Sequence, residues 1–416
     1  MNTPLKQTPL HEWHVTAGAN MADFGGYDMP LWYETGVKTE HLAVLTSAGI
    51  FDTSHMACIS VIGDPAFELL NYCFTRDLGP LKQGRCVYGA FLNADGHCID
   101  DAIVYKFSDT CFMICVNAGM GAAITRHLEE QKSGRAVEIT DLSGKIAKID
   151  IQGFNSARIL SRVIRSPEKV FNGMPYFSFK GHFDPSQPSA DPVSLNTGTP
   201  VLLSRSGYTG EFGFEIFISP DAVVELWTTL LTQGKSFGIT TCGLGARDSL
   251  RAGACLPLSH QDIGDYKFMN HPWEFALPYT EDKKGFSKAF LGDTALIAEP
   301  GDLFVFPFAG DTLRKVAAGE ETGVYDSNNA RIGHVLTCAT DMGTTWHDNR
   351  LVSIATPDLP DQIRIKGISC GFVMVNKPLE KGTRLRLTEG KRSITVTVVS
   401  DVRPDRTARK KLSHFI

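Results

Sequence analysis

From residue 96 to residue 105 the chain reads Gly96-His97-Cys98-Ile99-Asp100-Asp101-Ala102-Ile103-Val104-Tyr105. β-branched and apolar residues follow an Asn-Ala-Asp-Gly turn sequence, which predicts a β-strand entered from a tight turn. Side chains alternate between the two faces of a strand, so Asp100 and Asp101 are expected to point in opposite directions and not to form a pair. Asp101, Ile103 and Tyr105 then share one face, where a carboxylate, an aliphatic side chain and a phenol suit a flat polar ligand. The alternative is that Asp101 only caps local backbone at the end of the turn.

Similar strand-like runs lie on both sides of this stretch. An amphipathic helix is expected at 222–233, and the segment from residue 10 to residue 49 is expected to be helical with turns. The mixture of expected strands and helices predicts an α+β fold. Beyond about residue 300, short strand-like runs separated by turn residues predict a separate small barrel. Strands are expected at 59–63, 86–91, 112–116, 201–204, 214–218, 332–336, 371–375 and 394–399.

Length and composition restrict the class of protein. The 416 residues suggest two or three modules, and 43% hydrophobic with 21% charged residues is typical of a globular protein. The formal net charge is -5, from 41 Lys+Arg against 46 Asp+Glu, so no global positive field attracts nucleic acid. No apolar run approaches the roughly 18 residues that span a bilayer, and the first residues lack a secretory signal. We therefore expect a cytoplasmic protein that binds neither nucleic acid nor membrane.

The ten cysteines occur singly within apolar, strand-like runs of a long chain. This arrangement favours reduced, buried thiols over a disulfide framework. Cys111 and Cys115 are the nearest pair, but no second pair or histidine doublet completes a zinc site. The sequence therefore predicts no metal site.

Two further segments carry polar side chains at turns. The stretch 204–215 is punctuated by glycines and enters a strand, so it is either a ligand-facing loop or a plain hairpin connection. Arg247 lies at the start of an expected helix, after Gly243 and Gly245. The third glycine of a dinucleotide loop is absent, which excludes a Rossmann site. Arg247 either holds an anionic ligand or is a surface arginine without a partner.

An ordered set of five blocks resembles the glycine-cleavage T-protein (aminomethyltransferase) family. Their joint occurrence over the first roughly 260 residues, in the family's order and spacing, is far more specific than any one block. The blocks are Met21-Ala22-Asp23-Phe24-Gly25-Gly26-Tyr27-Asp28-Met29-Pro30-Leu31, Gly49-Ile50-Phe51-Asp52-Thr53-Ser54-His55-Met56, Ile99-Asp100-Asp101, Ser206-Gly207-Tyr208-Thr209-Gly210-Glu211 and Cys242-Gly243-Leu244-Gly245-Ala246-Arg247-Asp248.

The resemblance implies a three-domain cloverleaf arrangement with tetrahydrofolate in its central opening. Residues 1–290 would form a folate-binding aminomethyltransferase module of two interleaved subdomains, and residues 300–416 a C-terminal β-barrel domain. Asp101 would be the catalytic carboxylate, close to the reacting folate nitrogens. The folate contacts implied by the matching positions are Tyr88, Ile103 and Tyr105 along the ring, Tyr208 beside the pterin, Glu215 on its polar edge, Arg247 on a folate oxygen, Met56 against the ligand and Asn117 near the donor arm.

The family's reaction moves a methylene group from an aminomethyl group, carried on the lipoyl arm of H-protein, to tetrahydrofolate and releases ammonia. By this resemblance Asp101 would orient the folate and stabilise the positive charge that develops on the transferred carbon. The resemblance implies no metal and no flavin. The expected partner is lipoylated H-protein.

The chain departs from the family pattern after Arg251. Where the family usually has Glu-Ala-Gly and Leu-Tyr-Gly, this chain has Gly253-Ala254-Cys255 and Leu258-Ser259-His260, and Thr337-Cys338-Ala339-Thr340 replaces a Thr-Ser-Gly pattern. These changes concern the donor side, so three alternatives are considered. One is a tetrahydrofolate-dependent demethylase acting on a small methylated amine, sulfonium or aryl ether. The second is a non-catalytic folate-binding relative, which would carry a Lys-Gly-Cys-Tyr-x-Gly-Gln-Glu motif that this sequence lacks. The third is a sarcosine-type dehydrogenase fusion, which would need a flavin-binding module that this sequence lacks.

Overall fold

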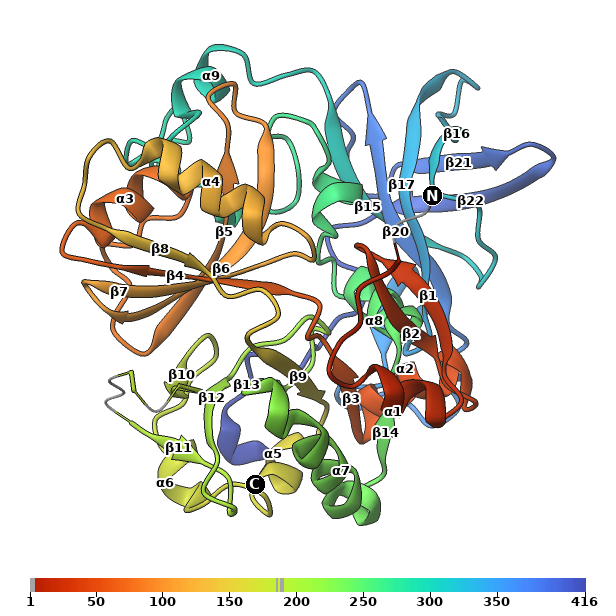
Figure 1. Cartoon of the computed structure of the whole chain (residues 1–416). Helices are drawn as coiled ribbons and strands as arrows, with labels where there is room; N and C mark the ends of the chain where they lie inside the picture. The colour runs from red at the N-terminus through yellow and green to blue at the C-terminus, as the bar shows by residue number, and fades with distance from the viewer. Residues whose placement is uncertain (1–3, 185, 188–190) are drawn as a thin grey trace.

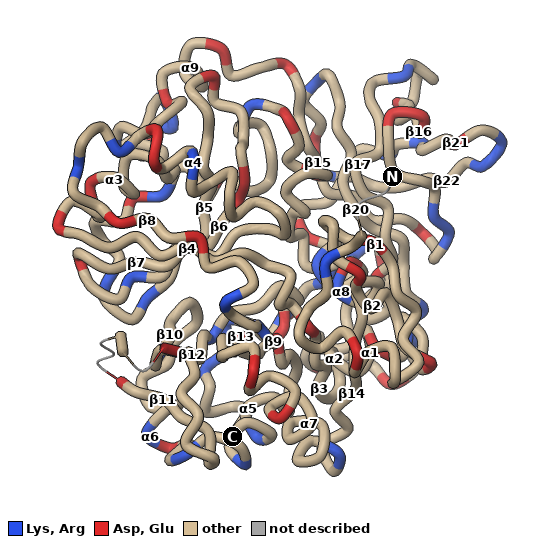
Figure 2. Tube along the Cα trace, viewed as in Figure 1, with Lys and Arg blue, Asp and Glu red and all other residues tan. Residues whose placement is uncertain are grey.

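The computed structural model describes residues 4–184, 186–187 and 191–416. The chain forms three lobes, each built on its own β-sheet, and the lobes meet at the centre of the molecule (Figure 1). Positive and negative side chains are interspersed over all three lobes (Figure 2). No helix in the described part of the chain has the length and apolar character needed to cross a membrane.

The first lobe contains a five-stranded antiparallel sheet in the order β5-β6-β7-β4-β8. Helices α3 and α4 pack on one face, where Leu69, Leu70, Ile124 and Leu128 are buried against the strands. The strand predicted around Asp101 is confirmed as β6. The elements are β4 (Ala57–Ile62), α3 (Ala66–Cys73), β5 (Arg85–Leu92), β6 (Cys98–Ser108), β7 (Cys111–Val116), α4 (Gly121–Gln131) and β8 (Glu138–Asp141).

The second lobe contains a seven-stranded sheet, ordered β10-β12-β13-β9-β3-β14 with β11 paired to β12. Neighbouring strands β3 and β9 come before and after the strands of the first sheet, so the first lobe is inserted within the second. The predicted helix at 222–233 is confirmed as α7, whose Leu226, Trp227 and Leu230 are buried against the sheet. The elements are β3 (Ala48–Asp52), β9 (Ala147–Gln152), α5 (Ser156–Leu160), α6 (Pro167–Phe171), β10 (Phe179–Gly181), β11 (Val193–Ser194), β12 (Pro200–Ser204), β13 (Gly213–Ile218), α7 (Val223–Gly234) and β14 (Ile239–Thr241).

The N-terminal segment is only partly helical, so the helical prediction for residues 10–49 is wrong in its middle. Helices α1 (His11–Thr16) and α2 (Gly36–Thr46) flank a hairpin of β1 (Asn20–Phe24) and β2 (Tyr27–Trp32). Gly25 and Gly26 form its two-residue turn at φ 58° and 81°. A turn with positive φ at both central residues matches the twist of paired strands, and a Gly-Gly pair allows it without steric cost.

The third lobe confirms the predicted C-terminal barrel. Its strands close in the order β15-β20-β17-β16-β21-β22, and α8 (Leu244–Gly253) packs against β17 and β20. The chain then returns to the second lobe, where it ends (Figure 1). There Phe415 stacks on Phe212 at 3.8 Å between ring centroids. The division into modules 1–290 and 300–416 stays a prediction. The remaining elements are α9 (Asp293–Ala298), β15 (Phe304–Gly310), β16 (Gly319–Tyr325), β17 (Arg331–Asp341), β18 (Thr344–His347), β19 (Arg350–Ser353), β20 (Ile368–Val375), β21 (Arg384–Glu389) and β22 (Arg392–Val398).

The first two sheets also pack against each other through a shared apolar cluster. Tyr105 of β6 lies in this cluster, with its ring edge-on to Phe179 of β10 and Phe217 of β13 at 5.3 and 5.6 Å. The contact joins the two sheets through β6, the strand that also carries Asp101.

Candidate functional site

A cavity of about 350 Å³ lies where the lobes meet. Strands β5, β6 and β7, the β1–β2 turn, the β12–β13 loop and α8 each contribute side chains to its wall. The lining residues are Phe24, Gly25, His55, Met56, Tyr88, Asp101, Ala102, Ile103, Cys115, Asn117, Ala118, Tyr208, Arg247, Pro257, Leu258, His260 and Gln261.

Seven of the nine predicted site residues line this cavity. They come from separate parts of the chain, and the tertiary fold brings them together. These seven are Met56, Tyr88, Asp101, Ile103, Asn117, Tyr208 and Arg247. Tyr105 and Glu215 lie behind the wall instead.

The Asp101 carboxylate is held at the cavity by two side-chain hydrogen bonds. One oxygen accepts a hydrogen bond from the Tyr88 hydroxyl at 2.8 Å, and the other accepts one from the Asn117 side-chain amide at 2.6 Å. Burial and the adjacent Asp101 charge raise the pKa of Tyr88 well above its usual value, so the phenol keeps its proton and acts as the donor. The Asp101 side chain therefore has a defined orientation before any ligand enters.

Asn117 joins Asp100 to Asp101, contrary to the prediction that the two carboxylates point in opposite directions and form no pair. The Asn117 amide nitrogen also donates to Asp100 at 2.8 Å, and the Asn117 backbone N–H donates to the second Asp100 oxygen at 2.9 Å. The pairing of β5 with β6 shifts here: Phe91 faces Asp100 but Leu92 faces Cys98, which leaves Ile99 as an extra residue. Such a bulge reorients neighbouring side chains, so alternation along an ideal strand did not describe Asp100.

The coupling changes how the two acids hold protons. Burial, followed by the charge of Asp101, raises the pKa of Asp100 to about 7. Burial also raises the pKa of Asp101, while the hydrogen bonds from Tyr88 and Asn117 act in the opposite direction. Below about pH 7 the pair therefore holds a proton that two exposed aspartates would have lost.

Arg247 is a partnered arginine, which excludes the alternative of a surface side chain without a partner. It lies in the first turn of α8 and is held by Asp150, 2.9 Å from its guanidinium nitrogen. The guanidinium also lies over the Tyr208 ring, 4.7 Å from the centroid, in a cation–π contact. The pair thereby forms one charged wall of the cavity.

A buried ion cluster continues behind this wall to Glu215. Lys148 contacts Asp150 at 2.7 Å and also pairs with Glu215, which accepts a further hydrogen bond from the Ser206 hydroxyl. Burial disfavours a charged lysine, but Asp150 and Glu215 outweigh it and raise the pKa of Lys148. Glu215 is 5% exposed and its carboxylate is used within this cluster.

Tyr105 shares the strand face of Asp101 and Ile103 but is displaced along β6 into the packing between the two sheets. It is fully buried, and its hydroxyl has no hydrogen-bond partner among the described residues. A contact between Tyr105 or Glu215 and a ligand stays a prediction.

The sequence did not predict that the segment 257–261 forms part of the cavity wall. A π-helical turn, Ser259–Ile263, places His260 and Gln261 at the cavity, and Tyr208 donates a hydrogen bond to the Pro257 carbonyl. In the sequence, the departure from the family pattern at Leu258-Ser259-His260 was the signal that could have pointed to this part of the wall. Isolated π-helical turns occur often at functional sites because the extra residue reorients side chains.

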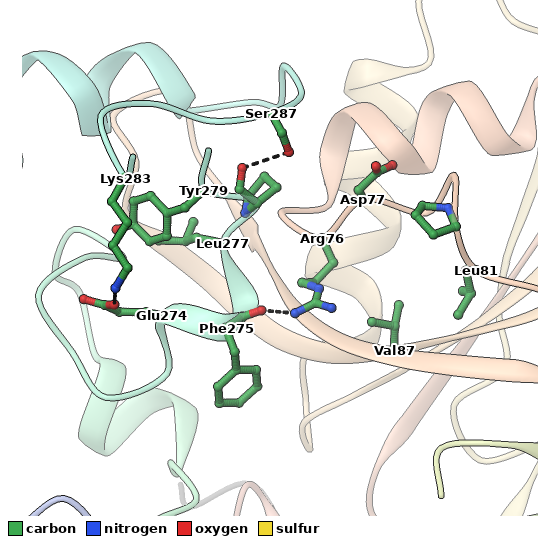
Figure 3. Close-up of a pocket in the computed structure, with 12 residues that line it drawn as sticks. Arg76, Asp77, Leu81, Val87, Glu274, Phe275, Leu277, Tyr279, Lys283 and Ser287 are labelled. Atoms are coloured by element: carbon green, nitrogen blue, oxygen red, sulfur yellow. Dashed lines mark hydrogen bonds and ion pairs between the residues drawn. The ribbon is translucent and has the colours of Figure 1, made fainter. Parts of the chain in front are cut away.

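A second hollow, of about 560 Å³, lies outside this cavity between Arg76 of the first lobe and the segment 274–287 (Figure 3). Two polar interactions lie in its wall: Lys283 pairs with Glu274 at 2.8 Å, and Arg76 donates to the Phe275 carbonyl. The Phe275 ring lies 5.7 Å from the ring of Tyr88. We therefore interpret Phe275, in the wall of this hollow, as a packing partner that supports the Tyr88 ring.

Comparison with known proteins shows similarity along most of the chain. Residues 10–280 match the family described as the GCVT N-terminal domain. An aminomethyltransferase of Leptospira biflexa is 38% identical over 301 residues, which cover 71% of this chain and 74% of that protein. An aminomethyltransferase of Anoxybacillus flavithermus is 32% identical over 385 residues, 91% of this chain and 100% of its own.

A solved structure matches the whole arrangement. The glycine cleavage system aminomethyltransferase T of Bartonella henselae superimposes with a TM-score of 0.76 at 28% identity. The match covers 98% of this chain and 99% of the other, so it includes all three lobes. The predicted three-domain architecture is thereby confirmed.

Proposed function

The chain belongs to the glycine-cleavage T-protein family, the aminomethyltransferases, and we propose that it transfers a methylene group to tetrahydrofolate from an aminomethyl group on the lipoyl arm of H-protein, releasing ammonia. The observation that carries this proposal is the Asp101 carboxylate, held by Tyr88 and Asn117 in a cavity at the junction of the lobes.

The side chains of the cavity fit a folate. Its volume of about 350 Å³ lies in the range of roughly 300–1,000 Å³ typical of small-molecule sites. Ile103, Met56 and the Tyr88 and Tyr208 rings supply apolar surface for a flat ring system, and Arg247 supplies a cation for a folate oxygen. A carboxylate can accept two hydrogen bonds from an amino-pyrimidinone edge, which is the role proposed for Glu215 behind the wall.

In the proposed reaction Asp101 acts on the charge that develops during transfer. The carbon gains iminium-like positive character as the donor nitrogen leaves, and a carboxylate fixed within the cavity stabilises that charge without reorganising. Tyr88 and Asn117 hold Asp101 in place, so the nucleophilic nitrogen and the carbon are brought together in a defined geometry. Tetrahydrofolate supplies the nucleophilic nitrogen that takes up the one-carbon unit.

Identification of the folate product tests the proposal. Purified protein is incubated with tetrahydrofolate and aminomethylated H-protein, and in parallel with small methylated donors. Methylene-folate formed only with H-protein supports the proposal, whereas methyl-folate formed from a methylated donor would establish a demethylase instead.

Folate binding is tested separately by thermal unfolding. A ligand that binds only the native state stabilises it by RT ln(1 + [L]/Kd), so tetrahydrofolate should raise the melting temperature. A folded protein whose melting temperature does not change at millimolar tetrahydrofolate would contradict the proposed folate site.

A further inference from the structure

His260 stands at the cavity beside the two aspartates. Its Nε2 atom lies 3.6 Å from a carboxylate oxygen of Asp100, and its side chain is 58% exposed while that of Asp100 is fully buried. The charge of His260 also lowers the pKa of Asp101. An imidazole therefore lies between the mouth of the cavity and the buried acids.

The turn that carries His260, Ser259–Ile263, is held firmly by its other residues. Asp262 accepts hydrogen bonds from the Thr337 hydroxyl at 2.6 Å and the Leu258 N–H at 2.9 Å, and it pairs with buried Arg251. Gln261 donates to the Leu336 carbonyl at 2.7 Å and to Thr337 at 2.8 Å.

On the inner side of the turn, the Ser259 hydroxyl accepts the backbone N–H of Asp101 at 3.3 Å. The turn is thus bonded both to barrel strand β17, through Leu336 and Thr337, and to β6. His260 is the one residue of Ser259–Ile263 that is exposed at the cavity without being used as an anchor. Thr337 and His260 both belong to segments in which the sequence departs from the family pattern, so the two departures form one connected structure.

We propose that His260 delivers a proton to the departing nitrogen of the one-carbon donor, and that the Asp100–Asn117–Asp101 cluster returns a proton to His260. This inference rests on the proposed function and assigns the proton transfer of that reaction to a residue of this chain. Imidazole is the side chain that exchanges protons most readily near neutral pH, which suits this role.

The proposed transfer conserves protons and electrons. As the folate nitrogen bonds to the carbon, the bond from carbon to the donor nitrogen breaks and its electron pair stays on that nitrogen. The donor nitrogen takes a proton from the His260 imidazolium and leaves as ammonia. The proton lost by this folate nitrogen passes to the aspartate cluster and then to His260. The carbon is then bonded to the lipoyl sulfur and to the first folate nitrogen. The second folate nitrogen bonds to the carbon as the carbon–sulfur bond breaks, the electron pair of that bond stays on sulfur, and the proton lost by the second nitrogen converts the thiolate to the thiol, so the protein returns to its starting state.

The groups that face His260 favour this path. Asp100 and Asp101 of β6 supply negative charge, and Arg247 of α8 supplies positive charge across the cavity. Tyr88 of β5 and Tyr208 of the β12–β13 loop keep their protons, because burial raises the pKa of both phenols. The neighbour from β17 is Thr337, which is uncharged and contacts Gln261 and Asp262 on the far side of the turn.

The test compares His260→Gln with wild type and with His347→Gln. His347 is a matched control because it is also half exposed, at 44%, but lies in strand β18 away from the cavity. Single-turnover formation of methylene-folate from aminomethylated H-protein is measured across about pH 5–8, the range in which imidazoles titrate. Tetrahydrofolate affinity is measured by calorimetry and folding by thermal unfolding.

We expect His260→Gln to slow the transfer by about 100-fold, the scale of a lost general acid, with folate affinity unchanged within about twofold. The dependence of the rate on pH should differ between the variant and wild type, and added imidazole should restore part of the rate, while His347→Gln should match wild type in rate and pH dependence. A His260→Gln protein with the wild-type rate and pH profile overturns the inference but leaves the proposed function intact. A wild-type protein that forms no methylene-folate overturns the proposed function and the inference with it.

Discussion

The side-chain amide of Asn117 donates a hydrogen bond to Asp101 at 2.6 Å, and the same nitrogen reaches Asp100 at 2.8 Å. One neutral amide thus bridges two buried carboxylates that are adjacent in sequence. Because Asn117 follows β7 while both acids belong to β6, this bridge links the ends of two neighbouring strands at the cavity.

Replacing Asn117 tests the importance of the bridge. Asn117→Ala removes a hydrogen bond to a charged group, an interaction worth roughly 1.5–3 kcal/mol, so we expect turnover to fall by about 10- to 100-fold. The fold should be retained, because the side chain lies at the cavity and not in an apolar core. Steady-state kinetics together with the melting temperature check this, and unchanged kcat would show that Asp101 does not need the bridge.

Asp101→Asn should abolish turnover while the protein stays folded. The amide has nearly the volume of the carboxylate and can still accept the hydrogen bond from Asn117, but it lacks the negative charge that stabilises the transferred carbon. Methylene-folate formation and circular dichroism are the measurements. Residual turnover above about 10% of wild type would remove Asp101 from the catalytic role, since loss of one electrostatic stabiliser typically costs a factor of about 100 or more.

The raised pKa of Asp100 predicts how the stability of the protein depends on pH. Its pKa is about 7 in the folded protein, against about 4 when unfolded, so the folded state binds more protons between these values. The free energy of unfolding contributed by this group therefore decreases as pH rises from about 4 to about 7. Asp100→Asn cannot titrate, so wild type should lose stability relative to the variant over this window. Denaturation at pH 5 and pH 8 measures the difference, and an equal difference at both would contradict the assigned pKa.

Glu215→Gln should affect both stability and folate binding. Lys148 would keep Asp150 but lose one of its two buried charged partners, which should lower the free energy of unfolding by about 1–3 kcal/mol. If Glu215 also accepts hydrogen bonds from the pterin edge, tetrahydrofolate affinity should fall by about one to two decades at a temperature where the variant is folded. Calorimetry separates the two effects, and weaker stability with unchanged affinity would leave Glu215 as a purely structural residue.

Gly253→Ala should destabilise the contact between α8 and the barrel. Alanine is favoured over glycine in an isolated helix by about 1 kcal/mol, but a Cβ atom here would lie 1.8 Å from the Asp341 carboxylate and 2.8 Å from the Arg403 guanidinium. Asp341 and Arg403 form a buried ion pair, so relieving the clash must disturb it. Gly285→Ala is the control, since a Cβ at that position meets nothing within 4 Å. A melting temperature for Gly253→Ala at or above that of the control would contradict the expected clash.

The sequence alone determined the elements whose signals are local. The strand containing Asp101, the amphipathic helix α7, the helix that begins before Arg247 and the β-rich C-terminal lobe all follow from periodicity and turn residues within short windows. The grouping of Met56, Asp101, Tyr208 and Arg247 came from the ordered family blocks and not from any local pattern.

Only the tertiary structure decided how these groups interact. A one-residue bulge at Ile99 couples Asp100 to Asp101, although an ideal strand would separate them. Glu215 meets Lys148 across 67 positions of sequence, and packing between two sheets draws Tyr105 away from the cavity. His260 reaches Asp100 because Asp262 and Gln261 bind Thr337 of the barrel. Each outcome depends on contacts between segments far apart in the chain, whose geometry is set by the packing of the whole fold and leaves no signal in a short stretch of residues.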